Sequence, residues 1–259
     1  MYKRKTNVLD DLLYGGAELF LPSVSVDCVI FGFHAGELKV LLLKGKHESK
    51  WALPGGFIYQ DENVEEAASR VLQERTQLTG IFLQQFHLFG DVQRTEQKHA
   101  RRWLEEARVK DPDSHWIMQR FVTIGYYALV EYQKVNPVPD DYSSECAWHN
   151  VLELRNLIID HKQIVEKGLE SLRLHLNFQP IGYNLLPKEF PLKDLQLIYE
   201  TILGKKLDRS NFQRKILSYG ILDRKEKQFS GGSHRAPYLY SFNKKKYFKA
   251  LQEGLNKEW

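Results

Sequence analysis

The stretch WALPGGFIYQDENVEEAASRVLQERTQLTG, residues 51–80, carries the residues whose types and spacing best fit a chemical task. It begins with a Gly-Gly turn, passes through an acidic loop and enters a segment with helical periodicity. Carboxylates one helical turn apart share a face of a helix, where they can hold a hard cation such as Mg²⁺ against a phosphate ester. Glu62 and Glu74 fit this role, but two neighbouring positions hold Val71 and Arg75 instead of acids.

The spacing of this stretch resembles the Nudix box, in which a glycine is followed by an acidic loop and by a helix rich in Arg and Glu. Gly56, Glu62, Arg70 and Glu74 match that pattern. Where the family has Glu, Glu and Gly, this chain has Val71, Arg75 and Gln77. Nudix hydrolases use Mg²⁺ or Mn²⁺ to cleave nucleoside diphosphates linked to another group. Because Arg75 would repel such a cation and can pair with Glu74, we expect hydrolysis to be absent or vestigial, with no catalytic residue, metal or cofactor.

The elements that position these residues are indicated by hydrophobic periodicity and turn signals. Runs of β-branched and aromatic residues predict strands over residues 23–33, 38–45, 81–90, 120–132 and 146–154. Apolar residues at helical spacing predict helices over residues 64–78 and 160–176. The charged segment 93–115 is expected to be a mobile surface insertion, and the Pro-containing segment 177–191 is expected to join two domains.

The bulk composition is that of a soluble globular protein, with 42% apolar and 27% charged residues. Cys28 and Cys146 fit no metal-binding or redox spacing, so we expect two reduced thiols. The sequence shows no signal-peptide core and no apolar run near the roughly 20 residues that a membrane helix needs. We therefore expect a cytoplasmic protein with no membrane partner.

The charge is distributed unevenly along the chain. Residues 180–259 contain 16 lysines and arginines against 8 acids, whereas residues 1–179 contain 21 against 25. An acidic body with a basic C-terminal part indicates a polyanionic partner. The alternative is a basic surface that is simply solvated.

Two amphipathic helices are expected in the basic part, over residues 191–204 and 208–220, with Asp208 at the N-cap of the second. Two strands around a Gly-rich basic tip follow within residues 221–242. A helix, a turn, a second helix and a two-stranded wing form the layout of a winged helix, whose second helix enters the major groove of DNA. The structural alternative is a basic helical cap that packs on the first domain.

The second of these helices has an apolar side and a polar side. Phe212 and Ile216 are expected to face inward, with Leu217 as a further candidate. Arginine reads guanine edges, asparagine and glutamine read adenine edges, and a wing can touch phosphate or the minor groove. The candidate DNA-binding residues are Arg209, Ser210, Asn211, Gln213, Arg214, Lys215, His234 and Arg235.

Along nearly its whole length the chain resembles the bacterial Nudix-related transcriptional regulators, which include regulators of NAD metabolism and arabinose-responsive ones. The resemblance rests on WALPGGFIYQDE, RFVTIGYYALV, QPIGYNLLPKEFPLKDLQLIYETILGKKLDRSNFQRKI and GSHRAPYLYSFNKKKY. It implies an α+β chain in which a Nudix α/β/α sandwich with a mixed sheet precedes a C-terminal winged helix-turn-helix domain. The expected parts are an extension over residues 1–20, a Nudix-like effector domain over 21–178 and a winged-helix domain over 179–259.

The resemblance also implies a mechanism. A small effector would bind in the former substrate pocket, and a homodimer would bind palindromic double-stranded operator DNA as a repressor. Effectors in the family include ADP-ribose-like nucleotides and pentoses, and the missing acids favour a sugar or a nucleotide-sugar metabolite here. The candidate effector-binding residues are Trp51, Glu62, Arg70 and Glu74. Trp51 has an equal alternative, which is ordinary core packing.

Two other functions stay open at this point. The first is a Mg²⁺-dependent Nudix hydrolase that acts on ADP-ribose or a related nucleoside diphosphate derivative, which Val71 and Arg75 argue against. The second is a nucleotide-binding adaptor that holds a protein partner through its basic domain. Measured indifference to DNA would favour the adaptor.

Overall fold

The computed structural model describes residues 10–46, 49–94, 97–139, 143–227 and 237–255. These residues divide into two compact units. The first unit holds the described residues up to 31, 40–128 and 135–168, and the second holds 32–39, 129–134 and those from 169 onward. The domain boundaries expected at residues 20 and 178 stay predictions.

The first unit is built on a sheet whose described strands run in the order β3-β2-β1-β6-β5, with β4 paired to β1 and β7 paired to β2. The strands are β1 (Phe20–His34), β2 (Glu37–Gly45), β3 (Trp51–Ala52), β4 (Gly55–Tyr59), β5 (Leu83–Phe89), β6 (Val122–Val130) and β7 (Ser143–Asn150). The helices are α2 (Gly16–Leu19), α3 (Val64–Thr76), α4 (Gln97–Glu106) and α5 (His161–His175). Residues 26–32 of β1 are buried on both faces, so the sheet needs a covering layer on each side.

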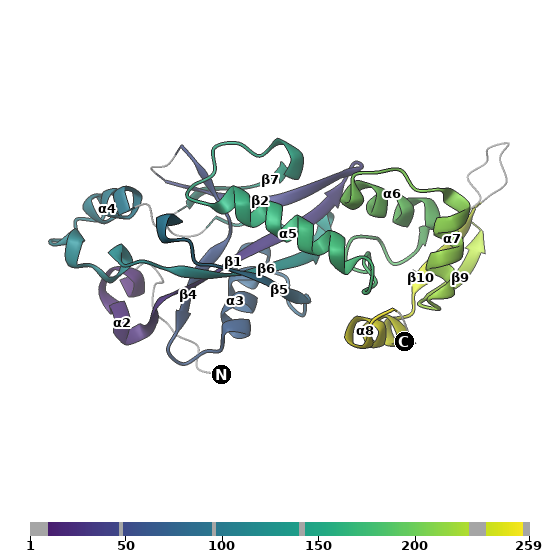
Figure 1. The fold of residues 1–259 in the computed structure, drawn as a ribbon, viewed down its shortest axis with the longest axis horizontal. Helices are drawn as coiled ribbons and strands as arrows, with labels where there is room; N and C mark the ends of the chain where they lie inside the picture. The colour runs from purple at the N-terminus through teal and green to yellow at the C-terminus, as the bar shows by residue number, and fades with distance from the viewer. Residues whose placement is uncertain (1–9, 47–48, 95–96, 140–142, 228–236, 256–259) are drawn as a thin grey trace. The chain divides into compact units, whose positions relative to one another are not determined.

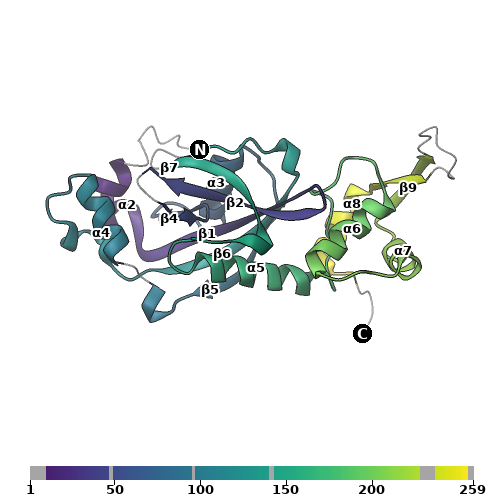
Figure 2. The same cartoon turned by 90° about the horizontal axis from the view of Figure 1, so that it is seen from above.

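Helices α3 and α5 supply these two layers (Figure 1, Figure 2). Cys28 and Val29 are neighbours in β1 and therefore point to opposite faces of the sheet. The Cys28 thiol donates to the Ala68 carbonyl of α3 at 3.8 Å. Val29 packs against Gly168 of α5, where an added Cβ would lie 3.3 Å from the Val29 side chain. This arrangement is the α/β/α sandwich that the resemblance implies.

Most described residues of the segment 93–115 are exposed or half-buried, and its helix α4 also contributes to the core. Leu104 of α4 is fully buried, and Trp103 packs against an aromatic cluster of the same unit. The buried members of that cluster are Leu12, Phe20, Tyr59, Trp116 and Phe121. The many charged residues of this segment lie mostly on its solvent side, and its few apolar residues anchor it to the domain. The mobility expected for the segment stays a prediction.

The described residues of the second unit form a three-stranded sheet in the order β8-β10-β9 and the helices α6, α7 and α8, besides the C-terminal half of α5. The elements are β8 (Phe190–Pro191), α6 (Leu192–Leu203), α7 (Arg209–Ser218), β9 (Leu222–Lys227), β10 (Tyr238–Phe242) and α8 (Lys244–Glu253). Helix α6 stops at Gly204, whose φ of 68° lies in the left-handed region that glycine adopts without strain. Helix α8 was not predicted from the sequence; its N-cap is Asn243, whose side chain accepts a hydrogen bond from the Lys246 N–H at 3.2 Å.

The core of the second unit forms between α6, α7 and the sheet. The apolar side of α6 is buried as predicted, and the ring of Tyr199 meets Phe212 of α7 edge-on at 5.3 Å between centroids. Ile216 is also buried, but Leu217 is 42% exposed, so an inward position for Leu217 is wrong. One residue of helix turns the chain by about 100°, which carries Leu217 away from the face that Ile216 occupies. Across the described residues, no helix is long and apolar enough to cross a membrane.

Candidate effector site and DNA-binding surface

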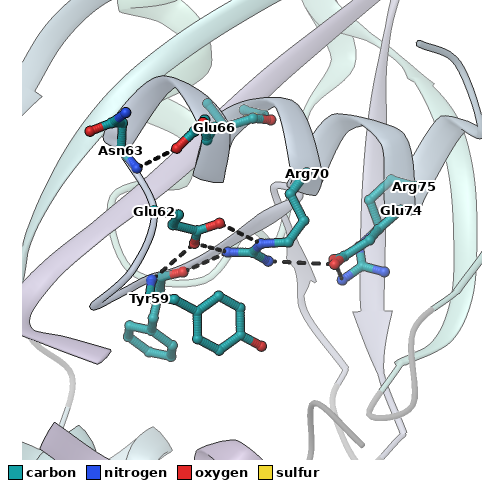
Figure 3. A network of polar contacts seen from close by, with 10 residues as sticks. Tyr59, Glu62, Asn63, Glu66, Arg70, Glu74 and Arg75 are labelled. Carbon is teal, nitrogen blue, oxygen red and sulfur yellow. Dashed lines mark hydrogen bonds and ion pairs between the residues drawn. The ribbon is translucent and has the colours of Figure 1, made fainter. Parts of the chain in front are cut away.

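A network of polar contacts surrounds Arg70 on α3 (Figure 3). Its guanidinium meets the Glu62 carboxylate twice, at 2.7 Å from Nη2 to Oε1 and at 3.1 Å from Nε to Oε2. Nη2 also donates to the Phe57 carbonyl at 2.9 Å, and the guanidinium lies 4.7 Å from the centroid of the Tyr59 ring. Burial lowers the pKa of Arg70, but the hydrogen bond and charge of Glu62, with Glu74 and Tyr59, outweigh burial and raise it above its ordinary value. Arg70 is thus a charged link between the acidic loop and α3.

The next turn of α3 holds the residues that depart from the Nudix box. Arg75 is 5% exposed, and its Nη2 lies 3.6 Å from Glu74 Oε2, which confirms the expected pairing of these two side chains. Glu74 Oε1 also lies 3.4 Å from Arg70 Nη1, so two arginines share one carboxylate. Val71 is fully buried, and its Cγ2 lies 3.1 Å from the place of a Cβ on Gly56. Among the described residues, no group of three His, Cys, Asp or Glu side chains is placed to hold a metal ion.

Gln77 occupies the position where the family has glycine, and it ends α3 in the left-handed conformation, at φ 60° and ψ 13°. Its N–H donates to the Gln73 carbonyl at 2.8 Å. Glycine takes this conformation without strain, whereas a residue with a Cβ does so at a cost of about 1 kcal/mol. Gln77 therefore holds a conformation that glycine would adopt with less strain.

Trp51, on β3, has contacts of a different kind. It is half-buried, its ring meets His149 edge-on at 4.2 Å between centroids, and Lys44 Nζ lies 5.6 Å from its centroid. Its backbone is held by the Asn156 carbonyl at 2.8 Å and by the Ile158 N–H at 2.9 Å. The structure joins the other three candidate effector residues in one network, and the contacts described for Trp51 involve none of them. Its role in effector binding stays a prediction.

A buried charged cluster around Arg94 was not predicted from the sequence. Arg94 Nη2 lies 3.0 Å from Asp27 Oδ2, and its Nε lies 2.9 Å from Asp160 Oδ2. Asp27 pairs with Gly55 across β1 and β4, where a side chain on Gly55 would clash with the Asp27 carboxylate. The two glycines expected to form a turn begin strand β4 instead, and the cluster ties the inserted segment to this strand and to the start of α5. One signal was available, since Asp27 is a lone acid among buried apolar residues and so requires a buried cation.

The polar side of α7 is exposed in the second unit. The Asp208 carboxylate accepts a hydrogen bond from the Asn211 N–H at 2.8 Å, which confirms its position as the N-cap. The Asn211 side-chain oxygen accepts from Arg214 Nη2 at 2.7 Å. Of the six candidate residues on this helix, Gln213 is half-buried and the other five are exposed, namely Arg209, Ser210, Asn211, Arg214 and Lys215. Their roles stay predictions, but the burial of Phe212 and Ile216 settles that this side faces outward.

The turn before α7 is held by side chains of α6. Glu200 accepts hydrogen bonds from the Leu207 N–H at 3.0 Å, from Lys206 Nζ at 2.9 Å and from Gln196 Nε2 at 3.0 Å. Gln196 Nε2 also donates to the Leu207 carbonyl at 3.0 Å. The hydrogen bond from the Leu207 N–H, with those from Lys206 and Gln196, lowers the pKa of Glu200 to about 2. The N–H and the carbonyl of Leu207, the residue directly before the N-cap of α7, are thus both held by hydrogen bonds to side chains of α6.

Strands β9 and β10 form the wing. Arg224 stacks on the ring of Tyr238, with its Cζ 3.3 Å from the ring centroid, and Lys227 Nζ lies 5.0 Å from the same centroid. His234 and Arg235, which were predicted to touch DNA, lie outside the described residues. Their role therefore stays a prediction.

The fold and the site together define a Nudix domain followed by a winged helix. The NUDIX domain family matches residues 21–168, and the chain belongs to this family. The domain described as the NrtR DNA-binding winged helix domain matches residues 182–242. The α+β fold expected from the sequence, a Nudix sandwich and then a winged helix, is confirmed.

Relatives with the same two parts are known. The chain is 29% identical over 229 residues to the "ADPR responsive transcriptional repressor NtrR" of Acinetobacter baylyi, which covers 85% of this chain and 82% of that protein. It is similar to Shewanella oneidensis NrtR complexed with a 27mer DNA, with a TM-score of 0.67, 28% identity and coverage of 87% and 95%. A MutT/nudix family protein from Enterococcus faecalis shares the fold, with a TM-score of 0.61, 22% identity and coverage of 93% and 96%. The resemblance to Nudix-related transcriptional regulators is confirmed.

Proposed function

We propose that this protein is a transcriptional repressor that binds operator DNA through its winged helix and is controlled by a small effector. The observation that carries the proposal is the exposed polar side of α7 within a domain of the NrtR DNA-binding type. Arg209, Asn211 and Gln213 have the donors and acceptors that read base edges, and the positive charge of residues 180–259 supplies affinity for phosphate. The Acinetobacter and Shewanella relatives, one named as a repressor and one crystallised with DNA, support this function.

We propose that a homodimer is the form that binds. Two copies of α7 related by a two-fold axis would enter the major groove at half-sites about 10 base pairs apart, so the operator would be palindromic. Light scattering of the complex on a duplex with two half-sites should give two chains per duplex. A complex with one chain per duplex at saturation would contradict the dimer.

The effector that we propose is ADP-ribose or a related nucleotide sugar, with a free sugar as the second candidate. The Acinetobacter relative is named as responsive to ADP-ribose. In this chain, Val71 and Arg75 stand where a Nudix hydrolase has metal-binding acids. The positive charge of Arg75, a residue that is 5% exposed, would favour a pyrophosphate without the cation that a hydrolase needs, so the ligand would bind without being cleaved. A free pentose carries no anionic group for this arginine to bind, which places it second.

The chain's own residues disfavour hydrolysis. A hard cation needs several oxygen ligands, but Val71 offers none and Glu74 is shared between Arg70 and Arg75. ADP-ribose incubated with the protein and Mg²⁺ should therefore stay intact. Formation of AMP and ribose phosphate that stops in Glu74→Gln would instead establish the hydrolase.

The DNA-binding part is tested by mobility shift with duplexes from the region upstream of the gene and its neighbours, against scrambled duplexes at moderate salt. Arg214→Ala should weaken operator binding by about 1–3 kcal/mol, about 5- to 150-fold, and Gln213→Ala should relax the base preference. Arg102→Ala on α4, where the side chain is 63% exposed, removes the same charge and serves as the control. Equal affinity of the unaltered protein for operator and scrambled duplexes would contradict the proposal.

The effector part is tested by calorimetry with ADP-ribose, ribose and arabinose, each with and without Mg²⁺. We expect ADP-ribose to bind without Mg²⁺ and to change the affinity for the operator, because linkage makes the two effects reciprocal. Arg75→Ala should weaken ADP-ribose binding. Binding of a pentose with no response to ADP-ribose would replace the first candidate by the second.

A further inference from the structure

Two cations share one aromatic ring on the strands of the wing. Arg224 Cζ lies 3.3 Å from the centroid of the Tyr238 ring, and Lys227 Nζ lies 5.0 Å from it. Tyr238 pairs with Lys227 across β9 and β10, and the register shifts between Tyr238 and Tyr240, which pairs with Arg224. Arg224 is exposed and Tyr238 is 38% exposed, so the cluster faces solvent.

Stacking leaves the hydrogen-bond donors of this cluster available. A guanidinium stacks through its flat face, and its N–H groups lie in its plane and point outward. Within the described part of the chain, no acid forms an ion pair with Arg224 or Lys227, although Asp223 and Glu226 lie on the same strand. Asp223 is engaged instead by Asn243 Nδ2, at 3.2 Å. Two cations held at one ring repel each other, and an anion bound between them relieves that repulsion.

We propose that Arg224, Lys227 and Tyr238 form a phosphate site that holds one phosphodiester group of a DNA backbone. This inference rests on the proposed function, because DNA is the polyanion that the winged helix is proposed to bind. The Arg224 fork matches two phosphate oxygens, Lys227 adds a point charge, and the Tyr238 hydroxyl is a further donor. Backbone phosphates carry no sequence information, so the site adds affinity and leaves base discrimination to α7.

Loss of one phosphate contact has a defined salt signature. The logarithm of the binding constant falls with the logarithm of salt concentration by about 0.9 per neutralised phosphate of B-DNA. Arg224→Ala should therefore make this slope shallower by about 0.9. At about 1 M salt the phosphate contact contributes nothing to the binding constant. At about 0.1 M salt, Arg224→Ala should therefore weaken binding about eightfold.

The experiment measures fluorescence anisotropy of the full chain with two labelled duplexes across a salt series. One duplex has a mixed sequence and the other comes from the upstream region, and both have the 27mer length seen with the Shewanella relative. Arg224→Ala should weaken binding to both duplexes by the same factor. Arg224→Lys should keep the slope but lower the affinity, because it keeps the charge and loses the fork. Tyr238→Phe should cost less than Tyr238→Ala, since only the second removes the stacking platform.

The control Arg102→Ala should leave both slope and affinity unchanged. If the unaltered protein binds the duplexes and the Arg224→Ala variant binds them with the same salt slope and the same affinity, the phosphate site is overturned while the proposed function stands. If the unaltered protein binds neither duplex at low salt, the proposed function itself is overturned. Loss of binding to poly-glutamate with unchanged DNA binding would overturn the phosphate site in favour of an acidic protein partner.

Discussion

Removal of the Arg94 guanidinium should destabilise the first unit severely. Breaking a buried ion pair by removing one partner costs about 3–5 kcal/mol, because the other charge stays buried and uncompensated. Here Asp27 and Asp160, with side chains 9% and 13% exposed, lose the same partner. We therefore place the effect of Arg94→Ala at the upper end of that range, about 5 kcal/mol. That is a large part of the about 5–15 kcal/mol that holds a typical native protein together.

The assay is urea unfolding of the full chain, followed by circular dichroism. Arg102→Ala is the matched control, because Arg102 lies in the same inserted segment and pairs at the surface with Glu106 at 3.1 Å. Loss of such an exposed pair costs less than about 1 kcal/mol. Arg94→Met combined with Asn at positions 27 and 160 should recover most of the stability, since no charge is left unpaired. Equal stability of Arg94→Ala and Arg102→Ala would refute the reasoning.

Three further predictions concern single residues. Gln77→Gly should raise the stability by about 1 kcal/mol in the same assay, because it relieves the left-handed strain, and a loss of stability would contradict this. The pKa of Glu200 is lowered from its ordinary value of 4.5 to about 2, so its ionised carboxylate stabilises the fold at pH values above 4.5. This contribution is lost as the pH falls towards about 2. Glu200→Gln should remove that part of the pH dependence of unfolding and weaken DNA binding at pH 7, whereas an unchanged acid profile would count against it. Burial, with the charge of Asp27, raises the pKa of Cys28, so a thiol reagent at pH 8 should leave Cys28 unmodified until urea is added. Its modification in the folded protein, read by mass spectrometry, would refute this.

Helices α3, α5, α6 and α7 could be predicted because their apolar residues recur at the helical period. Helix α6 shows this clearly, since the buried positions Leu195, Ile198 and Ile202 follow that period and Gly204 marks the end. Helix α8 was missed because three lysines open it, and cations at the N-terminus of a helix oppose its dipole. Its Asn243 cap was a local signal that the charge run obscured.

The candidate site could be predicted only where a local motif defines it. The spacing from Gly56 to Glu74 covers one short strand, one loop and one helix that follow each other directly, so sequence distance translates into a contact such as that of Arg70 with Glu62. Arg94 meets its partners across 67 and 66 residues of chain. No periodicity relates such positions, because the register of the sheet and the path of the inserted segment decide which charges meet.

The three departures from the Nudix box act differently on its backbone, its packing and its charge. Gln77 ends α3 in the left-handed conformation at a cost in strain. Val71 is packed against Gly56, so a single return to glutamate would place a carboxylate in a fully buried position. Arg75 neutralises Glu74, the remaining acid of this turn. A metal site made of three acids would require Val71 and Arg75 to be replaced by acids together and the packing of Val71 against Gly56 to be rebuilt, which is in line with the proposed use of the box for binding without cleavage.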